Sequence, residues 1–293
     1  MQCPRLDHFV RFNPNGTVSP CGHMVNTPQF DSLEDMQYSK LIHKIKESFS
    51  MDQWPDECIR CQEVEFEGRN SIRNHSIKFD QQQTVADYLI VGGVLDNVCN
   101  SACMMCNEHL STRIGALKNI PIRVDNTNRF WSLPTDRIVQ LDLNGGEPSY
   151  SKNYRAVLAN LPANVKSIRL NTNCSTVLEE LVSIAERGID VTVTVSLDGI
   201  GPVHDLVRWP ITWAEFYQNL MTYKSMPVQL NLWTTVSVLN IDDLPNIVEF
   251  ARQHNIDHDY AYLKHPMELA VNYPDMITQQ AYIQNQKQLR CIK

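Results

Sequence analysis

The hydrophobic and polar positions of residues 86–265 alternate in a way that predicts strands followed by helices. Short apolar runs of strand length recur here, and longer amphipathic segments separate them. The predicted strands are Tyr88–Leu95, Ile138–Leu143, Ser167–Asn171, Val191–Leu197, Gln229–Val238 and His258–Leu263. The predicted helices are Cys103–Leu117, Asn153–Leu161, Thr176–Arg187, Trp213–Lys224 and Asp243–Gln253. This alternation is typical of the α/β class, with a parallel sheet and crossover helices.

Six strands are too few for a closed eight-stranded barrel, so the pattern favours an open, partial (β/α)6 barrel. A flat doubly wound sheet is the alternative. The alternation begins at residue 86, so we expect two domains. Residues 1–85 are expected to form a small cysteine-rich module with a β-hairpin, and residues 86–293 the partial barrel with a C-terminal helical segment.

Polar residues follow the predicted strands directly. In a parallel sheet the ends of the strands meet at one rim, where ligands bind. Each residue alone has a structural explanation, because Gly-Gly and Asp-Gly form turns and asparagines cap helices. Their coincidence on one rim favours a binding site. The residues concerned are Asn144-Gly145-Gly146-Glu147-Pro148, Asn171-Thr172-Asn173-Cys174, Ser196-Leu197-Asp198-Gly199, and Thr234, Thr235, Ser237 and Asn240.

Composition narrows the class of protein. The chain has 293 residues, 43% of them hydrophobic, and a formal net charge of −7 without a long basic run. The overall positive charge that is typical of nucleic-acid-binding proteins is therefore absent, and we expect no nucleic-acid partner. The sequence has no apolar run long enough to cross a bilayer and no secretory signal, so we expect a cytoplasmic protein. In a reducing compartment its nine cysteines favour metal binding over disulfides.

Cys99, Cys103 and Cys106 form a CxxxCxxC triplet. A [4Fe–4S] cluster normally takes four cysteine ligands, so three would leave one iron open to a substrate or cofactor. Three cysteines this close could also hold zinc, or nothing.

The triplet resembles the signature of the radical S-adenosylmethionine (SAM) superfamily. There the open iron binds SAM, and one electron cleaves it to a 5′-deoxyadenosyl radical that takes a hydrogen atom from a substrate. Gly145-Gly146-Glu147-Pro148 is similar to the family's GGEP motif, which contacts the SAM amino group. The resemblance implies catalytic and cluster-binding roles for Cys99, Cys103 and Cys106. It implies cofactor contacts from Met105, Asn171, Asn173, Ser196, Arg208 and Val236, with Arg208 pairing the SAM carboxylate.

The first 85 residues hold a second set of cysteines. Cys3 and Cys21 frame Phe9–Val18, which reads as a hairpin with Asn15-Gly16 at its turn, and Cys58 and Cys61 form a CxxC pair. Four thiolates suit either a second [4Fe–4S] cluster or zinc. The spacing of Cys3, Gly16 and Cys21 resembles SPASM and twitch auxiliary-cluster modules. Glu67 stands where a SPASM domain would have its next cysteine, so a single-cluster, twitch-like module fits better.

The resemblance implies a peptide or protein substrate, with a small metabolite or nucleoside as the alternative. It also implies a reducing electron donor such as flavodoxin or ferredoxin, and electron transfer through the auxiliary cluster. A different class remains open, in which both cysteine sets bind zinc in a non-catalytic binding module. Cys174 either faces the site, where it could donate a hydrogen atom, or is a small buried side chain. Among the histidines we single out His23, because it lies near Cys21.

Overall fold

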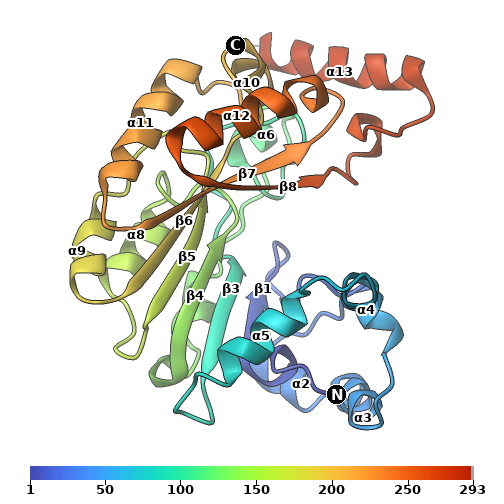
Figure 1. Cartoon of the computed structure of the whole chain (residues 1–293), viewed down its shortest axis with the longest axis vertical. Coiled ribbons are helices and arrows are strands. Elements are labelled where there is room, and N and C mark those ends of the chain that lie inside the picture. The colour runs from blue at the N-terminus through green and yellow to red at the C-terminus, as the bar shows by residue number, and fades with distance from the viewer. Residues whose placement is uncertain (292–293) are drawn as a thin grey trace. The chain divides into compact units, whose positions relative to one another are not determined.

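The computed structural model describes residues 1–291, and the chain forms two compact units (Figure 1). Unit 1 comprises Met1–Leu95, Asp125–Leu143 and Pro162–Val165. Unit 2 comprises Asp96–Val124, Asn144–Leu161 and the residues from Lys166 onward. The domain boundary after residue 85 stays a prediction.

Unit 1 combines four strands with short helices. Its strands follow one another in the order β2-β1-β3-β4. Its elements are α1 (Arg5–His8), β1 (Phe9–Phe12), β2 (Val18–Ser19), α2 (Leu33–Gln37), α3 (Lys40–Ser50), η1 (Asp56–Cys58), α4 (Ile59–Phe66), α5 (Ile72–Asp80), β3 (Leu89–Val94), α7 (Thr127–Trp131), η2 (Thr135–Arg137) and β4 (Ile138–Asn144, in this unit up to Leu143).

The predicted N-terminal hairpin is confirmed as β1 and β2, which pair antiparallel. Gly16 lies at its turn with a φ of 84°, a conformation that glycine adopts without steric cost. The backbone N–H of Asn13 donates to the carbonyl of Thr17 across the turn, at 2.8 Å. β1 also pairs with β3 in parallel, with Phe9 opposite Ile90. The hairpin is therefore joined to a strand that we assigned to the following domain.

Unit 2 contains four strands in the order β5-β6-β7-β8, and every neighbouring pair is parallel. Its elements are α6 (Thr112–Leu117), α8 (Lys152–Ala159), β5 (Ser167–Thr172), α9 (Glu180–Glu186), β6 (Asp190–Ser196), α10 (Pro202–Val207), α11 (Trp213–Ser225), β7 (Gln229–Val236), η3 (Ile241–Asp243), α12 (Leu244–His254), β8 (Asp257–Tyr262), η4 (Met267–Leu269) and α13 (Met276–Cys291). The expected α/β class with mostly parallel strands is confirmed.

Strands β5 and β6 have one buried and one polar face, because side chains alternate along a strand. Figure 1 shows α9 and α11 along the same side of these strands. Buried apolar side chains occupy one face, and polar side chains occupy the other. The buried residues are Ile168, Leu170, Val191, Val193 and Val195, and the polar residues are Arg169, Asn171, Thr192, Thr194 and Ser196. Asn171 and Ser196 thus lie on one polar face of neighbouring strands.

All six predicted strands from Tyr88 to Leu263 are confirmed, as is the C-terminal helical segment, as α13. Four of the five predicted helices are present with shifted ends. The fifth prediction, Cys103–Leu117, is wrong for most of its length, because only α6 is helical and the residues before it form turns. Among residues 1–291, no helix combines the length and apolar character needed to cross a bilayer.

Candidate functional site

The site in unit 2 is built on a loop, residues 97–111, that carries all three cysteines of the triplet and has no regular helix or strand. Polar groups point at its sulfurs. The backbone N–H of Ser101 donates to Cys99 Sγ at 3.4 Å, and the Arg208 guanidinium donates to Cys103 Sγ at 3.8 Å. Donors of this kind stabilise a thiolate.

The three thiols lie close enough to interact electrostatically. Burial raises the pKa of all three thiols, and the pKa of Cys106 rises to about 12. The negative charge of Cys103 raises the pKa of both Cys99 and Cys106 further. A cation bound among the sulfurs would instead lower the pKa of the thiols, because it favours the thiolate form.

The loop Gly145–Pro148 binds the segment just before Cys99 through its backbone. The N–H of Gly146 donates to Asp96 O at 3.0 Å, and the N–H of Glu147 donates to Val98 O at 2.8 Å. Gly146 is required for this approach, since a Cβ there would lie 2.3 Å from Val98 O. The close backbone contact that Gly146 allows is thus with the segment just before Cys99.

Glu147 is fully buried, and its carboxylate joins the loop Gly145–Pro148 to the end of β5. Its Oε1 accepts bonds from the Ser149 N–H and from the hydroxyls of Ser149 and Thr172, while Oε2 accepts the Asn173 N–H at 2.6 Å. Burial raises the pKa of Glu147, against the effect of these donors. The carboxylate is thus an anchor within unit 2.

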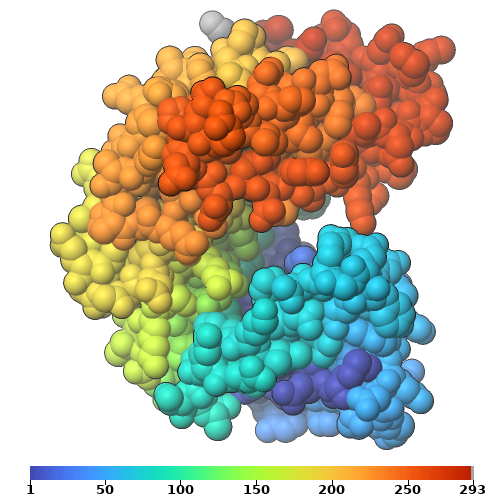
Figure 2. All heavy atoms as spheres, viewed as in Figure 1, coloured from blue at the N-terminus to red at the C-terminus, as the bar shows by residue number. Residues whose placement is uncertain are grey.

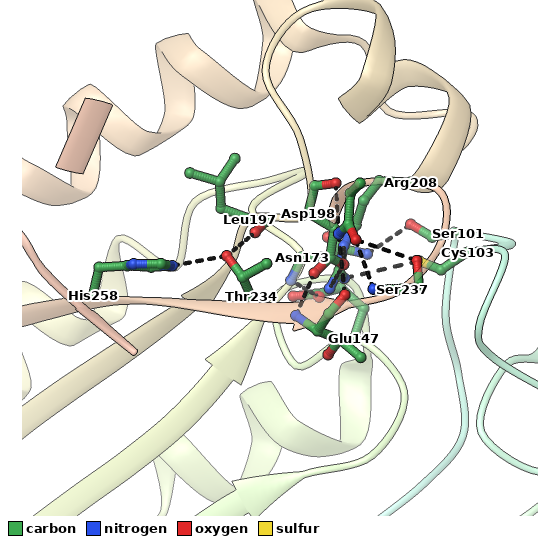
Figure 3. A network of polar contacts seen from close by, with 12 residues as sticks. Ser101, Cys103, Glu147, Asn173, Leu197, Asp198, Arg208, Thr234, Ser237 and His258 are labelled. Atoms are coloured by element: carbon green, nitrogen blue, oxygen red, sulfur yellow. Dashed lines mark hydrogen bonds and ion pairs between the residues drawn. The ribbon is translucent and has the colours of Figure 1, made fainter. Parts of the chain in front are cut away.

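Asn173 connects the end of β5 to the cysteine loop. Its amide nitrogen donates to Ser101 Oγ at 2.8 Å and to Asn100 Oδ1 at 3.1 Å. Figure 3 shows Ser101, Asn173 and Glu147 as one part of the polar network around Cys103. The predicted site residues Glu147 and Asn173 are therefore brought together with the triplet.

Arg208 and Asp198 form the other part of this network (Figure 3). Asp198 Oδ2 accepts from Arg208 Nε at 2.6 Å and Nη2 at 2.5 Å, and its Oδ1 accepts the Thr235 N–H at 2.7 Å. Burial opposes the charge of Arg208, but Asp198 and Cys103 more than offset it and raise its pKa. A buried, fixed cation thus lies beside the three-cysteine loop.

Five predicted cofactor contacts lie outside this hydrogen-bonded network within residues 1–291. Met105 is half-buried beside Cys106 in the loop, and Pro148 is buried at the end of the Gly-Gly-Glu-Pro segment. Asn171 and Ser196 lie on the polar strand face, and Val236 is fully buried at the end of β7. Their contacts with a cofactor stay predictions.

Cys174 does not face the site. Its side chain is fully buried, and Sγ lies 3.8 Å from the Phe216 carbonyl. The interpretation of this residue as a small buried side chain is confirmed.

The second set of cysteines lies in unit 1, where Cys3, Cys21, Cys58 and Cys61 line one small cavity together with His23. The thiols interact electrostatically. Burial and, after it, the charge of Cys21 raise the pKa of Cys3 to about 12, and burial and Cys3 raise the pKa of Cys58. The sequence-distant pairs are therefore brought together.

Cationic side chains surround this cavity. Arg5 and Arg73 also line it, and Arg5 lies 3.5 Å above the Phe9 ring. Arg73 donates to Glu65 Oε1 at 2.9 Å and to the carbonyl of Gln2 at 2.8 Å. This fixes the segment before Cys3, and the positive charges favour thiolates in the cavity.

For the described residues, 1–291, no three or more His, Cys, Asp or Glu side chains stand in the arrangement of a single metal-ion site.

Sequence reasoning missed two residues of the unit 2 network, Ser101 and Arg290. It placed Asp198 at the rim of the sheet, but it did not predict the ion pair of Asp198 with Arg208. Ser101 lies between two cysteines without a distinguishing pattern. Arg290 lies in a polar stretch near the C-terminus, and nothing in the sequence indicates its contact with Ala102 O at 2.6 Å.

No protein-family model matches this sequence, and no curated protein matches it. Among solved structures, the chain is similar to SuiB of Streptococcus suis bound to S-adenosylmethionine, with 13% identity and a TM-score of 0.44. That match covers 87% of this chain and 60% of SuiB. SuiB bound to the precursor peptide SuiA matches with 12% identity and a TM-score of 0.49, over 99% of this chain and 70% of that one.

A third similar structure is anSMEcpe with bound AdoMet and Cp18Cys peptide, at 15% identity and a TM-score of 0.42. The match covers 67% of this chain and 57% of anSMEcpe. Likeness at this level does not assign a function to this chain.

Proposed function

We propose that this protein is a radical SAM enzyme, which binds a [4Fe–4S] cluster through Cys99, Cys103 and Cys106 and takes a hydrogen atom from a substrate. The observation that carries the proposal is the backbone pairing of Gly146 and Glu147 with residues 96–98. Two motifs that are distant in the sequence are held against each other. A zinc-stabilised binding module has no need for this pairing.

The three thiols fit a cluster, because they are partly buried, lie within electrostatic range and accept donors on two of their sulfurs. Hydrogen bonds and nearby charge of this kind tune the reduction potential of such a cluster. When bound, the cluster and SAM supply the one-electron cleavage of SAM to methionine and a 5′-deoxyadenosyl radical.

The chain's own residues hold the two ends of the amino acid in SAM. Arg208 presents a permanent positive charge beside Cys103, which suits a carboxylate. Glu147 Oε1 already accepts three bonds, but Oε2 accepts one from Asn173 and has room for an ammonium donor. We infer that Glu147 both anchors its loop and meets the SAM amino group.

We also infer that β3 to β8 belong to a partial (β/α)6 barrel. Support comes from the parallel pairing within each unit and from the polar face of β5 and β6. Asn171 and Ser196 on that face are then available to the SAM ribose.

The cavity in unit 1 is proposed to hold a second, auxiliary [4Fe–4S] cluster. Four thiols complete the ligand set of such a cluster, so electron transfer is a more suitable role than substrate binding. Arg5 and Arg73 offset the negative charge of the thiolates.

The proposed substrate is a peptide or protein, and the electron comes from a flavodoxin- or ferredoxin-like donor. SAM and a peptide are also the ligands bound in the SuiB and anSMEcpe structures. For this chain, the substrate class and the donor are what the resemblance of its cysteine motifs implies.

Anaerobic reconstitution with iron and sulfide tests the proposal. We expect about eight irons per chain, from two four-iron clusters. We further expect the electron paramagnetic resonance (EPR) signal of the reduced protein to change when SAM is added, because SAM binds the open iron. Stoichiometric zinc, or a four-iron signal that ignores SAM, would reject the assignment.

A further inference from the structure

The cysteine loop has no secondary structure of its own, yet its backbone is held on both sides of Cys103. The N–H of Ala102 donates to the carbonyl of Trp209 at 2.8 Å, and the N–H of Met104 donates to the carbonyl of Val207 at 2.9 Å. The position of Cys103 therefore depends on the segment that directly follows α10.

Arg290 donates hydrogen bonds to both of the segments that pair here, the cysteine loop and the end of α10. Its Nη2 donates to the carbonyl of Ala102 at 2.6 Å, and its Nη1 donates to the carbonyl of Leu206 at 2.5 Å. The planar guanidinium can bridge two carbonyls in this way, whereas a lysine ammonium cannot match the fork geometry. The Trp209 ring adds a stacking surface, since Arg113 and Arg290 lie 4.6 Å and 5.9 Å from its centre.

The contact belongs to Arg290 itself rather than to the packing of its helix. α13 has no buried residue from Met276 to Cys291, and Figure 2 shows this helix in red on the surface of unit 2. Arg290 is half-buried and reaches the cysteine loop from the last turn of α13. Its two hydrogen bonds are thus a specific link between α13 and the loop.

Arg290 and Arg208 differ in whether a carboxylate neutralises their positive charge. Arg208 is paired with Asp198 in a salt bridge, whereas within residues 1–291 Arg290 forms no ion pair. Arg290 lies close enough to Cys103 for the two charges to interact. A net positive charge close to an iron–sulfur cluster favours the reduced form.

We propose that Arg290 is a positioning residue for the radical SAM cluster, which fixes the loop of Cys103 and raises the reduction potential of the cluster by its unpaired charge. The proposal rests on the proposed function, since it needs a cluster on the three cysteines. It does not require any particular substrate.

The test compares Arg290→Gln, Arg290→Lys and the control Lys287→Gln, each as anaerobically reconstituted protein. Lys287 lies one turn earlier on the same helix and is exposed, so its variant removes one positive charge without removing the link. The reduction potential of the three-cysteine cluster is measured by EPR-monitored titration. Hydrogen exchange is measured at the backbone amides of Ala102 and Met104.

For Arg290→Gln we expect about a tenfold lower ratio of reduced to oxidised cluster at the wild-type midpoint, which is about 59 mV for one electron. We also expect amide exchange in the loop at least tenfold faster than in the wild type. Arg290→Lys should keep the wild-type potential but exchange as fast as Arg290→Gln. Lys287→Gln should match the wild type in both.

Wild-type potential and wild-type exchange in Arg290→Gln would overturn the inference. If Arg290→Gln does not retain its cluster, the test uses Arg290→Lys instead. Wild-type exchange rates of the Ala102 and Met104 amides in Arg290→Lys would then overturn the inference. A wild-type protein without a four-iron signal would instead refute the proposed function.

Discussion

His204 is a buried histidine for which the site gives no role. It is fully buried, and neither ring nitrogen has a hydrogen-bond partner within residues 1–291. Burial and, after it, the positive charge of Arg208 lower its pKa from 6.5 to about 3. Because the folded-state pKa is depressed, the unfolded chain binds the proton first, and stability falls as the pH drops below 6.5.

We therefore expect His204 to cost the protein about 2 kcal/mol of unfolding free energy between pH 7.5 and pH 5.0. Between the same two pH values, the unfolding free energy of His204→Phe should fall by about 2 kcal/mol less than that of the wild type. The reason is that phenylalanine packs against Trp213 and Phe216 but does not titrate. Urea unfolding at both pH values measures this, with the exposed His75→Gln as the control. Identical pH dependence in wild type and His204→Phe would contradict the account.

Asp198 is expected to be a major determinant of stability in unit 2. Asp198→Asn leaves the Arg208 charge buried without its carboxylate, which typically costs about 3–5 kcal/mol. The comparison is Asp190→Asn, at the exposed start of the same strand, β6. Urea unfolding should separate the two variants clearly. If Asp198→Asn lowers the free energy of unfolding by less than about 1 kcal/mol, the expectation is wrong, because another group then stabilises the charge of Arg208.

At the scale of elements, the contact between the Gly145–Pro148 loop and residues 96–98 depends on Gly146. Alanine there would place Cβ 2.3 Å from Val98 O and 2.7 Å from Asn97 C, both backbone atoms that cannot rotate away. We expect Gly146→Ala to weaken SAM binding at least tenfold, as measured by calorimetry on the cluster-loaded protein.

The control for this prediction is Gly188→Ala. Gly188 has a φ of 81° and nothing within 4 Å of an added Cβ, so the substitution costs only backbone strain of about 1–2 kcal/mol. Wild-type SAM affinity in Gly146→Ala would mean that the pairing of the two loops does not shape the site.

The strands could be predicted from the sequence because apolar runs and polar strand ends are local signals. The cysteine loop could not, and its amphipathic pattern suggested a helix that is present only from Thr112. Its conformation depends on distant partners such as Trp209 and Arg290, which no local pattern reveals. The partners of Asp198 could not be predicted for the same reason, since Arg208 lies ten residues away and Thr235 lies 37 residues away.

At the scale of the whole molecule, the account has two clusters held by separate cysteine sets, one in each unit. Removing one ligand in unit 1 should therefore leave the other cluster intact. We expect Cys58→Ala to reduce the iron content from about eight to about four, while the EPR change caused by SAM is kept.

Cys291→Ala serves as the matched control, because Cys291 is exposed on α13 and should leave the iron content unchanged. Iron content that does not respond to Cys58→Ala would rule out the auxiliary cluster. Simultaneous loss of both clusters would show that the two sets are not independent.

Radical SAM chemistry in this protein is tested by the formation of 5′-deoxyadenosine from SAM. The reconstituted wild-type protein is incubated anaerobically with SAM and dithionite, and the product is quantified by mass spectrometry. Replacing Cys99, Cys103 and Cys106 together by alanine provides the matched control. We predict 5′-deoxyadenosine from the wild type and none above background from the triple variant. Equal amounts from both proteins, or none from a wild type that holds its full iron content, would contradict the account.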